Sequence, residues 1–180
     1  MSTATPDHFS LFGLEPRFGL DSEELTRAYR TVQAHVHPDR YAAAGAAERR
    51  AALQWATLAN EAFQVLNSPV RRAAYMCERH GVEVGREGGT AVPADFLEQQ
   101  LQWRQALEQL RGQGDVAGLQ ELRGQARALR EQEMARLRAQ IDVERDFAGA
   151  AASVRRLMFI EKFLRELAAF GDGPDRGHAD

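Results

Sequence analysis

The residues with the clearest capacity for chemistry stand together at positions 35 to 39, where His35 and His37 precede Asp39. Two imidazoles beside a carboxylate could bind zinc, but no third ligand follows at a metal-binding spacing. The lone cysteine, Cys77, falls on the apolar side of an expected helix, which favours a buried thiol over a nucleophile. The glycines at 81 to 89 follow no strand and form no phosphate-binding loop. We therefore expect no catalytic residue, no metal site and no cofactor.

Composition excludes several further classes of protein. The 180 residues include 23 basic and 26 acidic side chains, and this net charge of −3 disfavours general nucleic-acid binding. No apolar stretch approaches the roughly 18 to 20 residues of a membrane-spanning helix, and residues 1–7 lack the pattern of a secretory signal. A single cysteine suits a reducing compartment. We expect a cytoplasmic protein whose partners are neither nucleic acid nor membrane.

Helical periodicity extends along nearly the whole chain and predicts an all-α fold. Helices are expected at residues 7–12, 21–36, 46–66, 70–80, 93–111, 115–141 and 143–170. Pro38 ends the second helix because its ring pushes the preceding residue out of the α region. Glycine-rich residues 81–92 predict a linker. The expected domains are therefore residues 1–80 with four helices, the linker 81–92, residues 93–171 with three helices, and a disordered tail at 172–180.

Four segments in the first half of the chain carry a family resemblance. They are DHFSLFGL at 7–14, His-Pro-Asp at 37–39, NEAFQVLNSP at 60–69 and RRAAY at 71–75. In order and spacing they resemble the J domain of DnaJ-type co-chaperones. FLEQQL at 96–101 and RRLMFIEK at 155–162 are similar to the C-terminal segments of the HscB family, the co-chaperones of bacterial iron–sulfur cluster assembly. The resemblance covers about residues 7 to 170 and implies an L-shaped arrangement of the two domains.

The resemblance implies that His37, Pro38 and Asp39 dock on an HscA/DnaK-type ATPase chaperone and stimulate its ATP hydrolysis. The rigid turn at Pro38 would present an imidazole and a carboxylate, and Asp39 could form a charge-assisted bond with a partner arginine. Arg27, Arg30 and Arg40 could form a small basic patch that steers the encounter. A solvated helix face is an equally good interpretation of Arg27 and Arg30. Arg40 departs from the family pattern, in which lysine follows the aspartate.

The helix at 93–111 has more apolar residues than one core face uses. Phe96, Trp103, Leu107 and Leu110 fall on one stripe, whereas Leu97 and Leu101 lie about 100° and 140° from Phe96. Glu98, Gln105 and Glu108 fall beside that leucine pair. An off-stripe apolar pair flanked by polar groups suits a protein interface.

The last helix shows a similar surplus, since Phe159 and Phe163 point away from the stripe of Val154, Leu157 and Leu164. Both surplus pairs could instead pack against the first domain or on both sides of the helical bundle. Trp55 and Trp103 also lie on apolar stripes and are expected in the core. The resemblance implies that this region binds the IscU-type iron–sulfur scaffold protein, with Leu97 and Leu101 on the recognition helix.

The sequence thus predicts a non-enzymatic co-chaperone that delivers an IscU-type scaffold to an HscA/DnaK-type chaperone for cluster maturation or transfer. One alternative is a general DnaK adaptor for unfolded clients, which would lack a specific scaffold partner. Another is an arginine-rich nucleic-acid binder. From Ala91 onward the chain has 13 basic and 15 acidic residues, which disfavours that second alternative.

Overall fold

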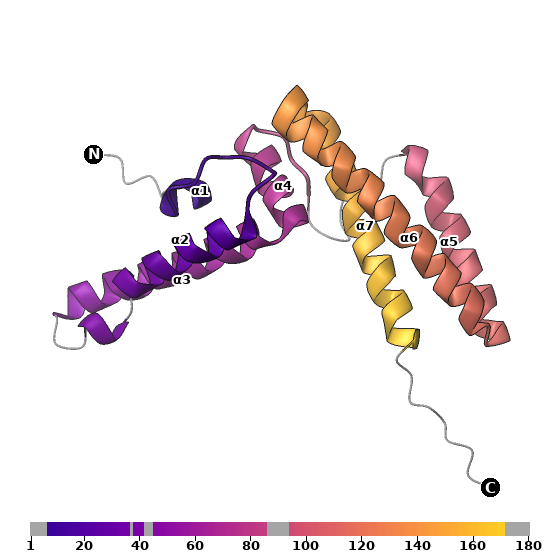
Figure 1. Ribbon diagram of the computed structural model, residues 1–180, viewed down its shortest axis with the longest axis horizontal. Coiled ribbons are helices and arrows are strands. Elements are labelled where there is room, and N and C mark those ends of the chain that lie inside the picture. Colours follow the sequence, from indigo (N-terminus) through magenta and orange to yellow (C-terminus); the bar gives the residue numbers. More distant parts are fainter. Residues whose placement is uncertain (1–6, 37, 42–44, 86–93, 172–180) are drawn as a thin grey trace, which may run out of the picture. The chain divides into compact units, whose positions relative to one another are not determined.

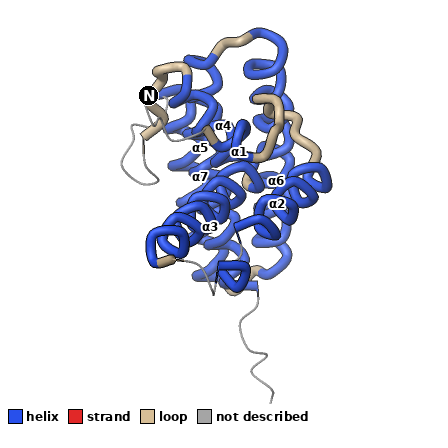
Figure 2. The backbone as a smooth tube through the Cα atoms, turned by 90° about the vertical axis from the view of Figure 1, so that its left-hand side faces the viewer, coloured by secondary structure: helices blue, strands red, loops and turns tan. Residues whose placement is uncertain are grey.

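The computed structural model describes residues 7–36, 38–41, 45–85 and 94–171, and within these ranges the regular structure is entirely helical. The chain divides into two compact units, Met1–His80 and Gly81–Asp180. Figure 1 shows the helices of each unit in the colours of the sequence. The absence of strands from the described residues confirms the predicted all-α fold (Figure 2). None of the described helices is long and apolar enough to cross a membrane.

The first unit is built around two long helices. Its elements are α1 (His8–Leu11), α2 (Ser22–Val36), the short 3-10 helix η1 (Pro38–Tyr41), α3 (Ala46–Asn67) and α4 (Pro69–Arg79). Figures 1 and 2 show α2 and α3 side by side, and the Tyr29 ring stacks on Phe63 with centroids 4.2 Å apart. Asp7 caps α1 and Ser68 caps α4 through side-chain oxygens that accept backbone N–H groups. These caps start the helices where the sequence predicts them.

The side chains that α3 contributes to the interior of the first unit are mainly small. Ala52, Ala59, Ala62 and Leu66 are buried, and Cys77 of α4 is a fully buried thiol, as expected. Small residues let neighbouring helices approach closely. Trp55 is 44% exposed, so the expectation that it anchors the core is wrong. The buried residues of α3 are mainly its alanines.

The second unit is a bundle of three long helices. It begins with Gly81–Gly85, whose Val84 is fully buried, and continues with α5 (Ala94–Gln113), α6 (Val116–Arg138) and α7 (Phe147–Gly171). Its core joins side chains of all three helices: Phe96, Trp103 and Leu107 of α5, Leu122 and Ala126 of α6, and Ile160, Phe163 and Leu167 of α7. Trp103 is 4% exposed, which confirms its predicted place in the core.

A π-helical turn, η2 (Ala139–Glu144), follows α6 where the sequence predicts continued α-helix to residue 141. Arg145 then adopts a left-handed conformation with φ of 58°, and the backbone N–H of Asp146 donates to the Gln140 carbonyl at 2.9 Å. The Asp146 carboxylate accepts from the Gly149 N–H at 2.9 Å and so caps α7. This cap explains why α7 starts at Phe147 rather than at the expected residue 143.

Polar pairs connect α6 and the η2 turn to α7 beside the apolar core. The Glu133 carboxylate lies 3.8 Å from the Arg156 guanidinium, and both residues are buried. From the π-helical turn η2, the Gln140 side-chain oxygen accepts a hydrogen bond from the Ser153 hydroxyl of α7 at 2.9 Å. Because buried polar groups need matching partners, these pairs favour one register of α6 against α7.

Candidate functional site

The turn after α2 carries the first candidate surface. α2 ends at Val36 and the backbone of Pro38–Tyr41 forms a 3-10 turn, in agreement with a helix that stops before Pro38. His37 and the side chains of Pro38 and Asp39 lie outside the described part of the chain, so their predicted contacts stay predictions.

Two side chains that follow the His-Pro-Asp tripeptide tie the turn back to α2. The Arg40 guanidinium donates to the Ala34 carbonyl at 2.9 Å, and the Tyr41 hydroxyl donates to the His35 carbonyl at 3.2 Å. Both bonds satisfy carbonyl groups that a helix C-terminus leaves unpaired, where a positive charge is also favoured. Arg40 therefore holds the turn, a role not foreseen for a residue expected in a basic patch. Tyr41 was not singled out because a lone aromatic residue after a turn has no periodic signal.

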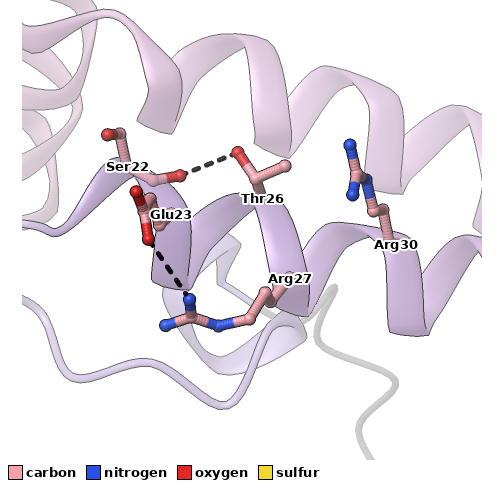
Figure 3. Close-up of a pocket in the computed structure, with 5 residues that line it drawn as sticks. All are labelled: Ser22, Glu23, Thr26, Arg27 and Arg30. Carbon is pink, nitrogen blue, oxygen red and sulfur yellow. Dashed lines mark hydrogen bonds and ion pairs between the residues drawn. The ribbon is translucent and has the colours of Figure 1, made fainter.

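Arg27 and Arg30 lie on the exposed face of α2, as predicted. Together with Ser22, Glu23 and Thr26 they line a hollow on this face (Figure 3). Arg27 forms an ion pair with Glu23 at 3.6 Å, while in Figure 3 the Arg30 side chain extends in a different direction. The Arg27 and Glu23 side chains are 68% and 84% exposed, so their pairing contributes little to stability.

The second candidate surface lies on α5, in the other unit. Phe96 and Leu107 are buried, whereas Leu97 and Leu101 are 48% and 62% exposed. The predicted division of α5 into a core stripe and an exposed leucine pair is therefore confirmed. The flanking Glu98, Gln105 and Glu108 are exposed as well. The Gln102 amide donates to the Glu98 carboxylate at 3.3 Å, one turn along the helix.

The two phenylalanines predicted to extend this surface differ in their surroundings. Phe163 is only 2% exposed and stacks on Trp103 with ring centroids 5.0 Å apart, so its assignment to a binding surface is wrong. Phe159 is half-buried and meets the Phe96 ring edge-on at 5.7 Å. Phe163 is buried because α7 contacts α5 as well as α6. Its second apolar face therefore packs inside the bundle, which is the alternative interpretation given above for these phenylalanines.

Two ionisable groups with shifted pKa values lie at the start of α1, in the first unit. Burial acts to raise the pKa of Asp7, but the N–H groups of Phe9 and Ser10 and the charge of Arg79 outweigh it, so the pKa is lowered. Burial lowers the pKa of His8, Glu61 and Asp7 oppose the shift, and Arg79 adds to it. Within the described ranges, no group of three or more His, Cys, Asp or Glu side chains could hold a metal ion.

Comparison with known proteins gives consistent matches over nearly the whole chain. Residues 92–168 match the family described as the HSCB C-terminal oligomerisation domain. The chain is 48% identical over 166 residues to the co-chaperone protein HscB homolog of Bordetella petrii, covering 92% of this chain and 96% of the relative. It is 46% identical over 169 residues to the HscB homolog of Burkholderia mallei, covering 94% and 96%.

Two solved structures have the same fold. The chaperone HscB from Vibrio cholerae superposes with a TM-score of 0.81 at 32% identity, covering 93% of this chain and 98% of that one. The human co-chaperone protein HscB superposes with a TM-score of 0.85 at 20% identity, covering 95% and 85%. At that lower identity the human structure supports the fold alone.

Proposed function

The chain belongs to the HscB family of co-chaperones, and from this premise we propose that it stimulates the ATPase of an HscA/DnaK-type chaperone and delivers an IscU-type iron–sulfur scaffold to it. The observation that carries the proposed scaffold binding is the leucine pair on α5, which stays exposed while the neighbouring apolar residues are buried. In this role the chain acts on its partner's ATP hydrolysis and supplies no catalytic residue. The reducing compartment expected for a chain with one cysteine agrees with action in the cytoplasm.

The chaperone-binding surface comprises His37, Pro38 and Asp39 with Arg27, Arg30 and Arg40. Pro38 fixes the turn, and the Asp39 carboxylate forms a charge-assisted hydrogen bond with a basic group of the chaperone. Arg40 positions the turn through its bond to the Ala34 carbonyl. Arg27 and Arg30, exposed on α2, raise the rate of encounter with an acidic surface.

The scaffold-binding surface has an apolar centre and a polar rim. Leu97 and Leu101 form the centre, and Glu98, Gln105 and Glu108 form the rim, the usual arrangement of a protein interface. Phe159 packs against Phe96 of the α5 core stripe and is half-buried, so it can contribute to this surface only through the part of its ring that stays exposed. Phe163 supports α5 from behind, through its contact with Trp103.

A chain that holds both partners raises their effective concentration for each other. The scaffold bound on α5 is thereby available to the chaperone whose ATP hydrolysis the His-Pro-Asp turn triggers. Hydrolysis then tightens the grip of the chaperone on the delivered scaffold.

Asp39→Asn tests the chaperone-binding surface. We expect the variant to lose stimulation of the chaperone ATPase while its circular dichroism spectrum and scaffold affinity stay unchanged, because the substitution removes a charge and keeps the shape. Glu78→Gln is the matched control, since it removes an exposed carboxylate on α4 of the same unit. Normal stimulation by Asp39→Asn would refute the assignment of this turn.

A further inference from the structure

A cluster of ionisable and aromatic side chains surrounds His8 at the start of α1. The His8 ring stacks on Tyr75 of α4, with centroids 4.2 Å apart and an interplanar angle of 15°. The His8 backbone N–H donates to the Tyr75 hydroxyl at 3.0 Å. Main chain and side chain of one residue therefore both attach α1 to α4.

Charged groups approach this histidine from three elements. Asp7 precedes it and forms an ion pair with Arg79 of α4 at 3.6 Å. The Arg79 guanidinium lies over the Tyr75 ring at 6.0 Å and over the Phe9 ring at 5.8 Å. Glu61 of α3 is the third charged group that acts on His8. Two carboxylates thus favour an imidazolium at this position, and one guanidinium opposes it.

Burial of a ring nitrogen is the effect that outweighs the attraction of the two carboxylates for a charged ring. His8 Nδ1 is buried and has no hydrogen-bond partner among the described residues. In the neutral ring this nitrogen is an uncharged polar atom without a partner, whereas in the imidazolium it is a charged donor without an acceptor. Burying a charged group without a partner costs more than burying a neutral one.

We propose that His8 is a pH-sensitive contact, in which protonation of the imidazole weakens the packing of α1 against α3 and α4. The direction follows from linkage. Burial lowers the pKa of His8 below its usual value of 6.5, so the open form of α1 binds a proton more readily than the packed form. Packing of α1 is therefore fully stable above about pH 6.5 and weakens as the pH falls through the lowered pKa.

The test is native-state hydrogen exchange of the whole chain between pH 5 and 8, a range above the titration of Asp7. The probes are the amides hydrogen-bonded in and around α1, namely those of His8, Leu11, Phe12 and Leu14. After correction for intrinsic exchange, we expect the opening constant of α1 to rise as the pH falls below 6.5, by at most about tenfold per pH unit for one proton. In parallel, an NMR titration of the His8 ring should give a pKa below 6.5.

Two variants test whether the pH dependence of α1 opening comes from His8 or from another histidine. His8→Phe keeps an aromatic ring against Tyr75 and removes the titrating nitrogen, so the pH dependence of α1 opening should vanish. His35→Gln removes an exposed imidazole from α2 of the same unit and should leave that dependence intact. A His8 pKa at or above 6.5 would overturn the proposal, and so would an unchanged pH dependence in His8→Phe. The titration of the unaltered chain decides the question even if His8→Phe does not fold.

Discussion

Replacing Leu97 and Leu101 together by alanine removes the apolar centre of the proposed scaffold-binding surface. The two residues are 48% and 62% exposed, so a partner covering both buries about as much apolar surface as one whole leucine side chain, worth about 1.5–3 kcal/mol. With tenfold in Kd for about 1.4 kcal/mol, the double variant should bind an IscU-type scaffold roughly 10- to 100-fold more weakly. Because both side chains lie outside the core, we expect Tm to change by only about 1–2 °C.

Isothermal titration calorimetry of the scaffold against the unaltered chain and the double variant measures this difference. Leu53→Ala is the matched control, because Leu53 is 60% exposed on α3 in the other unit and should leave scaffold affinity unchanged. Chaperone stimulation in the absence of scaffold should also stay normal in the double variant. Unchanged scaffold affinity in a folded double variant would refute the assignment, and an equal loss in Leu53→Ala would show that the effect is not specific to α5.

Two further predictions concern the bundle that supports this surface. Phe163→Ala should destabilise the chain by about 3–5 kcal/mol in urea unfolding, because the ring is buried against Trp103; a loss below about 1 kcal/mol would contradict its place in the core. Glu133→Ala should cost about 1–3 kcal/mol because it removes the carboxylate beside the buried Arg156 guanidinium, whereas the double variant Glu133→Leu with Arg156→Met should be near neutral. Equal losses in the single and double variants would show that desolvation of the pair does not govern this site.

The exposed leucine pair could be predicted because helical geometry alone separates it from the core. Residues about 100° from a stripe anchored by Phe96 and Trp103 must face away from it in any straight α-helix. The same method failed for Phe163, since it assumes that each helix has one buried face. α7 contacts two helices, and the periodicity of a single helix does not state how many neighbours it has.

Other features depend on how the elements meet. Trp55 lies on an apolar stripe, yet the α3 residues that other helices bury are mainly alanines. The bonds from Arg40 and Tyr41 to α2 carbonyls form only after the chain has turned, so residue spacing does not show them. The start of α7 could have been predicted from the sequence. Asp146 stands directly before the apolar run that begins at Phe147, which is where an N-cap residue is expected, and its carboxylate accepts from the Gly149 N–H.

The central claim is that one chain links a scaffold to a chaperone, and steady-state ATPase activity of the cognate HscA-type chaperone tests it most directly. The rate is measured with this protein alone, with the IscU-type scaffold alone and with both. We predict stimulation by both together that exceeds the sum of the separate effects. Equal stimulation of HscA and DnaK that does not respond to the scaffold would contradict the account and indicate a general adaptor for unfolded clients.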